Sequence, residues 1–123
     1  MIDILLAEDD DAMRQYLTRA LERAGYCVVA VDRGTDALAR VLAGEEFDLL
    51  LTDIVMPEMD GIELAQRVAR QQPSIRIMFI TGFSAVSLKA GEAVPQAKIL
   101  SKPFHLKELV THVHRVLQHN LGV

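Results

Sequence analysis

The sequence has 123 residues, of which 50% are hydrophobic and 24% are charged, and its formal net charge is −4. These values are typical of one soluble globular domain that can bury a core without disulfides. The sequence shows no basic patch for direct nucleic-acid binding, no membrane-spanning apolar run and no signal-peptide pattern. We therefore expect a cytoplasmic protein with residues 1–123 as its single domain. The one cysteine, Cys27, lies in a strand-like run, so we expect a buried and unreactive thiol.

Strand and helix patterns alternate through the first half of the chain. A short apolar run predicts a strand over 2–7, and apolar residues spaced three and four apart predict a helix over 13–24. A second strand is expected over 27–31, followed by a short helix over 37–42. The run over 48–53 contains three successive leucines, which is typical of a strand buried on both faces.

The same alternation continues to the end of the chain. A helical stripe over 62–69 is followed by an apolar strand pattern over 75–81. A weak helix is expected over 84–90, limited by the glycine that follows it, and a fifth strand over 98–101. The last amphipathic helix is predicted over 106–117. Five strands alternating with five helices favour an α/β fold with a doubly wound parallel sheet.

Polar side chains directly follow four of the five predicted strands. Right-handed crossovers place the carboxyl ends of parallel strands along one edge, where open α/β sheets bind ligands. Taken singly, these side chains also suit ordinary turn, cap or surface positions, but their joint placement favours a site. We expect convergence at this edge of Glu8, Asp9, Asp53, Thr81 and Lys102.

The chemistry of such a cluster points to a cation and a phosphoryl group. Packed carboxylates repel one another unless a cation is present, and hard oxygen ligands suit Mg²⁺. Asp53 would then act as a carboxylate nucleophile that forms an aspartyl phosphate. Lys102 would pair with a phosphoryl oxygen and Thr81 would donate a hydrogen bond to another. For Asp10 and Asp11 we prefer capping of the following helix.

Three histidines recur at intervals of seven residues near the end of the chain. His105, His112 and His119 share one predicted helical stripe. Successive members lie about 10 Å apart at 1.5 Å per residue, which is too far to chelate one ion. Solvated surface histidines are the better interpretation.

Four motifs together resemble the receiver domain of bacterial response regulators, with its CheY-like, flavodoxin-like (βα)5 fold. They are ILLAEDD, LLLTDIVMPEMDG, IMFITG and LSKPF, in family order along essentially the whole chain. The resemblance implies that Asp53 is the phosphoacceptor and that Mg²⁺ is held by Glu8, Asp9, Asp53 and the carbonyl of Val55. It also implies catalytic roles for Thr81 and Lys102.

The chain departs from the family pattern at one position. Many receivers carry an aromatic residue or a histidine three residues before the lysine, where this sequence has Ile99. A rotamer switch between Thr81 and an aromatic ring is therefore not expected. We expect the response to phosphorylation to involve the loop after the fourth strand, with Phe83 supplying apolar surface.

The resemblance implies a single-domain response regulator in a two-component phosphorelay, without an effector domain. Its phosphoryl donor would be a histidine kinase or a histidine phosphotransferase, and its output would be altered protein–protein contact. It would turn over no external metabolite, catalysing only its own phosphorylation and dephosphorylation. We expect a monomer or weak dimer that binds neither nucleic acid nor membrane.

The single-domain architecture, the TGF run after the fourth strand and the SKPFHL run are most similar to stand-alone receivers that control ClpXP-type proteolysis in alphaproteobacteria. That similarity implies a protease or adaptor partner. Two alternatives stay open: a phosphorelay shuttle between histidine-containing proteins, and a metal-dependent aspartyl-phosphate phosphatase. The phosphatase needs a second aspartate two residues after the nucleophile, where this chain has Val55.

Overall fold

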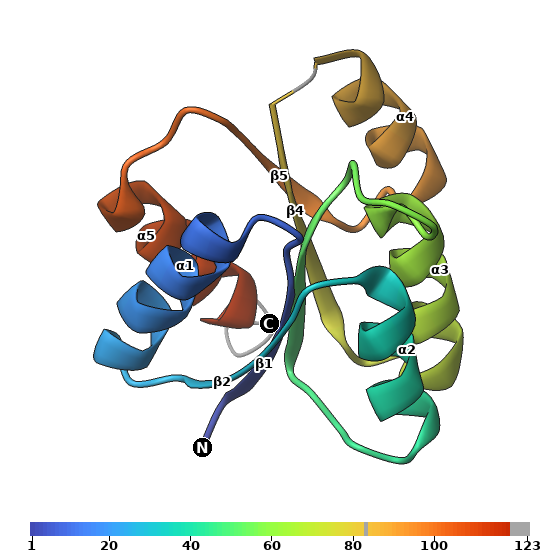
Figure 1. Cartoon of the computed structure of the whole chain (residues 1–123), viewed down its shortest axis with the longest axis horizontal. Helices are drawn as coiled ribbons and strands as arrows, with labels where there is room; N and C mark the ends of the chain where they lie inside the picture. Colours follow the sequence, from blue (N-terminus) through green and yellow to red (C-terminus); the bar gives the residue numbers. More distant parts are fainter. Residues whose placement is uncertain (83, 119–123) are drawn as a thin grey trace.

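The computed structural model describes residues 1–82 and 84–118, in which strands and helices alternate five times (Figure 1). The strands are β1 (Asp3–Ala7), β2 (Cys27–Val31), β3 (Leu49–Asp53), β4 (Arg76–Thr81) and β5 (Lys98–Ser101). The helices are α1 (Asp11–Arg23), α2 (Gly34–Leu42), α3 (Gly61–Gln71), α4 (Ser84–Ala93) and α5 (Leu106–Gln118).

All strand pairs are parallel, and the strand order in the sheet is β2-β1-β3-β4-β5. Figure 1 shows α1 and α5 on one face of the sheet and α2, α3 and α4 on the other. The predicted doubly wound sheet is therefore confirmed. Among the described helices, none combines the length and the apolar character needed to cross a membrane.

The central strand β3 is buried on both faces, as its unbroken apolar run predicts. Leu49, Leu50 and Leu51 are fully buried. Leu50 belongs to the core beneath α2, α3 and α4, whereas Leu49 and Leu51 pack into the core beneath α1 and α5. Side chains alternate across a strand, so one leucine run serves two cores.

The strand register brings the carboxyl ends of the strands level with one another. Ala7 at the end of β1 pairs with Thr52, and Asp53 pairs with Ile80 in β4. Thr81, the last residue of β4, pairs with a residue of β5 at that strand's own end. The residues that follow β1, β3 and β5 therefore lie together at the carboxyl-terminal edge of the sheet.

Three local predictions from the sequence are wrong. Cys27 is exposed, because β2 is an edge strand rather than an inner one. Helix α4 extends to Ala93, because Gly91 lies inside the helix without breaking it. His105 precedes α5 and therefore does not share its helical stripe, while His119 lies outside the described residues.

The capping prediction for Asp10 is confirmed, since its side chain accepts a hydrogen bond from the backbone N–H of Met13.

Candidate functional site

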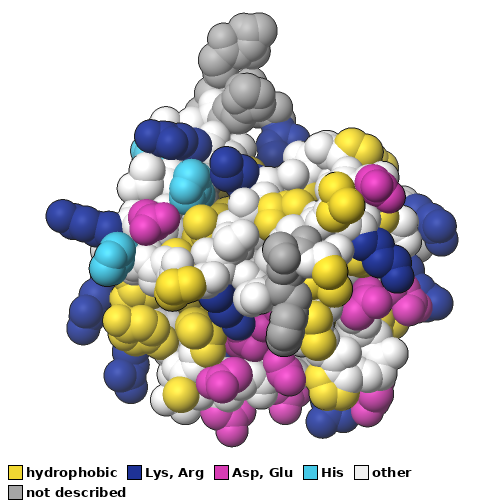
Figure 2. All heavy atoms as spheres, turned by 90° about the horizontal axis from the view of Figure 1, so that it is seen from above, with side chains coloured by type: hydrophobic (Ala, Val, Ile, Leu, Met, Phe, Trp, Pro, Cys, Tyr) yellow, Lys and Arg dark blue, Asp and Glu magenta, His cyan; other side chains and the backbone are white. Residues whose placement is uncertain are grey.

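Three carboxylates meet at the carboxyl-terminal edge of the sheet. Glu8 and Asp9 follow β1, and Asp53 ends β3. Each offers an oxygen, and these oxygens lie within 4.8 Å of one another. Glu8 and Asp53 are buried, whereas Asp9 is exposed. Figure 2 views the molecule from the side of this edge and shows acidic side chains gathered on it.

Lys102 supplies the positive charge at this cluster. Its Nζ lies 3.1 Å from Asp53 Oδ2 and 3.7 Å from Glu8 Oε1. The backbone N–H of Lys102 donates to the carbonyl of Thr81 at 2.7 Å, and the Lys102–Pro103 peptide is cis. Burial alone would lower the pKa of Lys102, but its hydrogen bond to Asp53 and the two carboxylate charges outweigh burial and raise it. The two carboxylates therefore keep the Lys102 side chain protonated at this edge.

Glu8 shows that the cluster fits a divalent cation. Its Oε2 accepts a hydrogen bond from the backbone N–H of Asp10 at 3.2 Å. Its Oε1 is buried and has no hydrogen-bond partner in the described part of the chain. Burial, followed by the charge of Asp53, raises the pKa of Glu8 to about 7. An orphaned buried oxygen among carboxylates suits a hard cation such as Mg²⁺.

The raised pKa of Glu8 predicts a pH-dependent stability without metal. The carboxyl takes up a proton more readily in the folded protein, because its pKa rises on folding from 4.5 to about 7. This tighter proton binding stabilises the folded protein. The stabilisation is complete below pH 4.5 and is lost as the pH rises through about 7. Because one pKa unit corresponds to about 1.4 kcal/mol, a rise in pKa from 4.5 to about 7 should lower the unfolding free energy by about 3–4 kcal/mol over that window.

Urea unfolding at several pH values in EDTA measures this dependence. Glu8→Gln is the matched control, because an amide of the same shape does not titrate in this range. The variant should lack the fall in unfolding free energy attributed to Glu8. Equal pH slopes for the wild type and Glu8→Gln would contradict the assignment.

The remaining predicted residues differ in how they stand to Asp53. Thr81 is buried at the end of β4. The backbone N–H of Val55 donates to Asp53 Oδ1 at 3.3 Å, and the Val55 side chain is 47% exposed. Ile99 is half-buried and packs against the core beneath α4. The predicted switch residue Phe83 lies outside the described residues.

The turn after β3 depends on a glycine placed against the backbone of Asp53. The N–H of Gly61 donates to the carbonyl of Ile54 at 2.7 Å. A Cβ built on Gly61 would lie 2.1 Å from the carbonyl oxygen of Asp53. Only a residue without a side chain lets α3 begin so close to Asp53. In the sequence alone, Gly61 indicates only a break in the chain before the next helix.

Sequence reasoning also missed a contact made by Arg14. Its guanidinium donates to the backbone carbonyl of Glu8 at 3.0 Å and pairs with Asp11 at 2.6 Å. Arg14 therefore ties the first turn of α1 to the acidic turn after β1. The spacing of Arg14 three residues after Asp11 is a recognisable helical ion pair, but it does not predict the longer reach to Glu8.

Comparisons with known proteins agree with this geometry. The family model described as the response regulator receiver domain matches residues 4–114. Response regulator receiver protein CpdR of Brucella abortus is 57% identical over 115 residues, covering 93% of this chain and 95% of CpdR. Sensor kinase CckA of the same organism is 38% identical over 118 residues, although the match covers only 12% of that kinase.

Solved structures give the same result. The crystal structure of a response regulator receiver protein from Sinorhizobium medicae superimposes with a TM-score of 0.87 at 32% identity, covering 95% of this chain and 94% of that one. The receiver domain of the hybrid histidine kinase CckA superimposes with a TM-score of 0.80 at 31% identity, covering 94% and 99% of the two chains.

Proposed function

The chain belongs to the response regulator receiver domain family of two-component signalling, and from this we propose that Asp53 is its phosphoacceptor. The observation that supports this most strongly is the setting of Asp53. It is a buried carboxylate at the end of the central strand, beside two further carboxylates and 3.1 Å from Lys102 Nζ. Receiver domains interact with kinases and phosphotransfer proteins, so a histidine kinase or histidine phosphotransferase is the proposed donor.

The proposed reaction is a transfer of one phosphoryl group. An oxygen of Asp53 attacks phosphorus, a P–O bond forms, and the bond from phosphorus to the donor breaks with its electron pair leaving on the donor. Lys102, which holds Asp53 before the reaction, would pair with a phosphoryl oxygen afterwards. The hydroxyl of Thr81 would donate a hydrogen bond to another. Positioning and charge neutralisation carry most of the catalysis in such transfers.

A magnesium ion would be held by Glu8, Asp9 and Asp53, with the carbonyl of Val55 as the proposed fourth protein ligand. When bound, Mg²⁺ neutralises charge on the phosphoryl oxygens. The Oε1 of Glu8 supports this assignment, because burying a carboxylate oxygen without a hydrogen-bond partner is costly. The chain's own part is to present these oxygens from two different strands.

Incubation with acetyl phosphate, with and without Mg²⁺, tests the proposed function. Intact mass spectrometry should detect a gain of one phosphoryl group that requires Mg²⁺ and disappears in EDTA. The expected reason is that three clustered carboxylates repel an incoming phosphate unless a cation neutralises them. A mass gain of the same yield in EDTA, or none under either condition, would count against the proposal.

Phosphorylation is proposed to change protein–protein contacts through the loop after β4, α4 and β5. Ile99 lies on this side and packs against the core beneath α4, together with Val86 and Ala93. Movement of Thr81 and Lys102 toward a phosphoryl group would disturb that packing. Phe83→Ala tests whether Phe83 contributes apolar surface to the switch. Phosphorylation-dependent partner binding that survives this change would contradict that role.

Similarity to CpdR over most of both chains supports a stand-alone receiver as the working unit. The resemblance to receivers that control ClpXP-type proteolysis makes a protease or adaptor the proposed partner, in the cytoplasm. A phosphorelay shuttle is the second candidate, and the 38% identity to part of the sensor kinase CckA favours it as an alternative. The phosphatase alternative is disfavoured, because the position for its second acid is the apolar Val55.

A further inference from the structure

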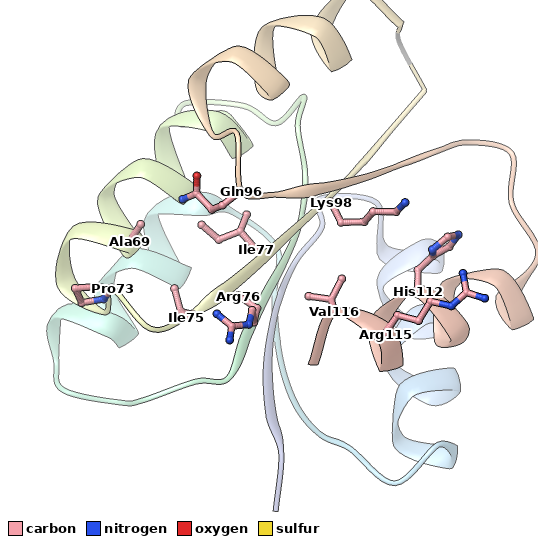
Figure 3. A pocket seen from close by; sticks show the side chains of 10 residues that line it. All are labelled: Ala69, Pro73, Ile75, Arg76, Ile77, Gln96, Lys98, His112, Arg115 and Val116. Atoms are coloured by element: carbon pink, nitrogen blue, oxygen red, sulfur yellow. The ribbon is translucent and has the colours of Figure 1, made fainter. Parts of the chain in front are cut away.

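A cavity lies at the opposite end of the sheet from Asp53. It has a volume of about 650 Å³ and is formed near the start of β4 and β5, between α3 and α5 (Figure 3). Thr81, at the site edge, and Arg76, at the cavity, are the two ends of β4. Five residue steps at about 3.3 Å separate them by about 16 Å. The cavity is therefore distinct from the carboxylate cluster.

The fold opens this cavity because β5 is short. β5 pairs with β4 only from Met78 onward, so Arg76 and Ile77 extend past its beginning. On α5, His112, Arg115 and Val116 are spaced three and four residues apart and share one helical face. Figure 3 shows these α5 residues on one side of the opening and the α3 residues on the other.

The lining of the cavity carries three permanent cations and no acidic residue. They are Arg76, Lys98 and Arg115, with His112 beside them. Within the described chain, no ion pair involves any of these three cations. A protein with a net charge of −4 thus concentrates unpaired positive charge in one hollow. Such a concentration favours an anionic ligand.

The α3 side of the same cavity is apolar. Ala69 and Pro73 face it from α3 and the residues just beyond, and Ile75 and Ile77 contribute buried side chains. Figure 3 shows this apolar group opposite Lys98, His112 and Arg115. The cavity therefore has Lys98, His112 and Arg115 at one side and an apolar wall at the other, with Arg76 between them, and its volume is within the range of small-molecule sites.

We propose that this cavity binds a small phosphorylated organic molecule of nucleotide size. Its phosphates would meet Arg76, Lys98 and Arg115, and its uncharged ring would lie against the apolar wall. Arginine suits this task because its planar guanidinium offers paired donors to phosphate oxygens. The inference does not depend on phosphorylation of Asp53.

Isothermal titration calorimetry in EDTA tests the inference, since without divalent cations the carboxylate cluster repels phosphates. The probes are ATP, AMP, adenosine and inorganic phosphate. ATP and AMP should bind, and adenosine and inorganic phosphate should each bind at least tenfold more weakly. Nucleotides that bind no more tightly than inorganic phosphate would overturn the proposal. Equal binding by adenosine would also overturn it, because charge would then play no part.

Variants locate the binding site. The double variant Arg76→Gln/Arg115→Gln should bind AMP at least tenfold more weakly, whereas Lys89→Gln removes an exposed cation on α4 and should bind normally. Because Arg76 is half-buried, the single reversal at the exposed position, Arg115→Glu, serves as a second variant with less risk to folding. Asp53→Asn should bind AMP like the wild type. Normal binding by both cavity variants, or loss of binding in Asp53→Asn, would refute the assignment.

Discussion

Replacing Asp53 with asparagine is expected to abolish phosphoryl incorporation from acetyl phosphate. The amide has the size of the carboxylate but lacks the negative oxygen that attacks phosphorus. Lys102 would also lose the charged carboxylate that lies 3.1 Å from its Nζ. Because the variant gains no phosphoryl group, the phosphoryl donor should no longer change its binding to other proteins. Intact mass spectrometry of the two proteins under the same conditions measures the first effect directly.

Asp60→Asn is the matched control for this experiment. Asp60 is exposed and caps α3 by accepting a hydrogen bond from the backbone N–H of Glu63 at 2.8 Å. Asparagine caps helices about as well as aspartate, so this variant should fold and gain the phosphoryl group normally. Phosphoryl incorporation that persisted in Asp53→Asn but vanished in Asp60→Asn would indicate that Asp60, and not Asp53, is the phosphoacceptor.

Replacing Gly61 with alanine is expected to destabilise the protein by about 3 kcal/mol or more, above the usual range for overpacking. The added Cβ would lie 2.1 Å from the carbonyl oxygen of Asp53, and a backbone atom cannot move aside as a side-chain tip can. The turn would have to shift, and the Asp53 carboxylate with it. Urea unfolding should give a lower midpoint for this variant, and its phosphorylation should be slower.

Gly91→Ala provides the control for the same change of residue type. Gly91 lies inside α4, and its added Cβ would come no nearer than 3.9 Å to Ile99. Alanine is favoured over glycine within a helix by about 1 kcal/mol, so this variant should be slightly more stable than the wild type. If Gly61→Ala unfolded at the same urea concentration as the wild type, the close approach would not constrain the turn.

The sheet and the carboxylate cluster at its edge were predictable because the sequence signals there are local. The leucine run in β3 indicates a strand covered on both faces, and Asp53 is the last residue of that strand. Parallel strands with helical crossovers then force the residues after β1 and β3 onto one edge. The observed 4.8 Å cluster of Glu8, Asp9 and Asp53 follows from topology rather than from any single motif.

Other features depend on tertiary packing that no local pattern encodes. Cys27 lies in a strand of ordinary apolar character, and only the strand order makes it an exposed edge residue. Gly91 looks like a helix breaker, but α4 continues through it. The cations at 76, 98 and 115 are far apart in the chain, so a search for charge runs finds no basic patch, although the fold gathers them in one cavity.

Chemical trapping tests most directly whether the acyl phosphate forms on Asp53. Borohydride reduces an aspartyl phosphate to homoserine, so peptide mapping of the reduced protein identifies the modified residue. After reaction with acetyl phosphate and Mg²⁺, homoserine is expected at position 53 and at no other aspartate. Homoserine at Asp9, Asp10 or Asp60, or its absence from a protein that has gained a phosphoryl group, would show that Asp53 is not the phosphoacceptor.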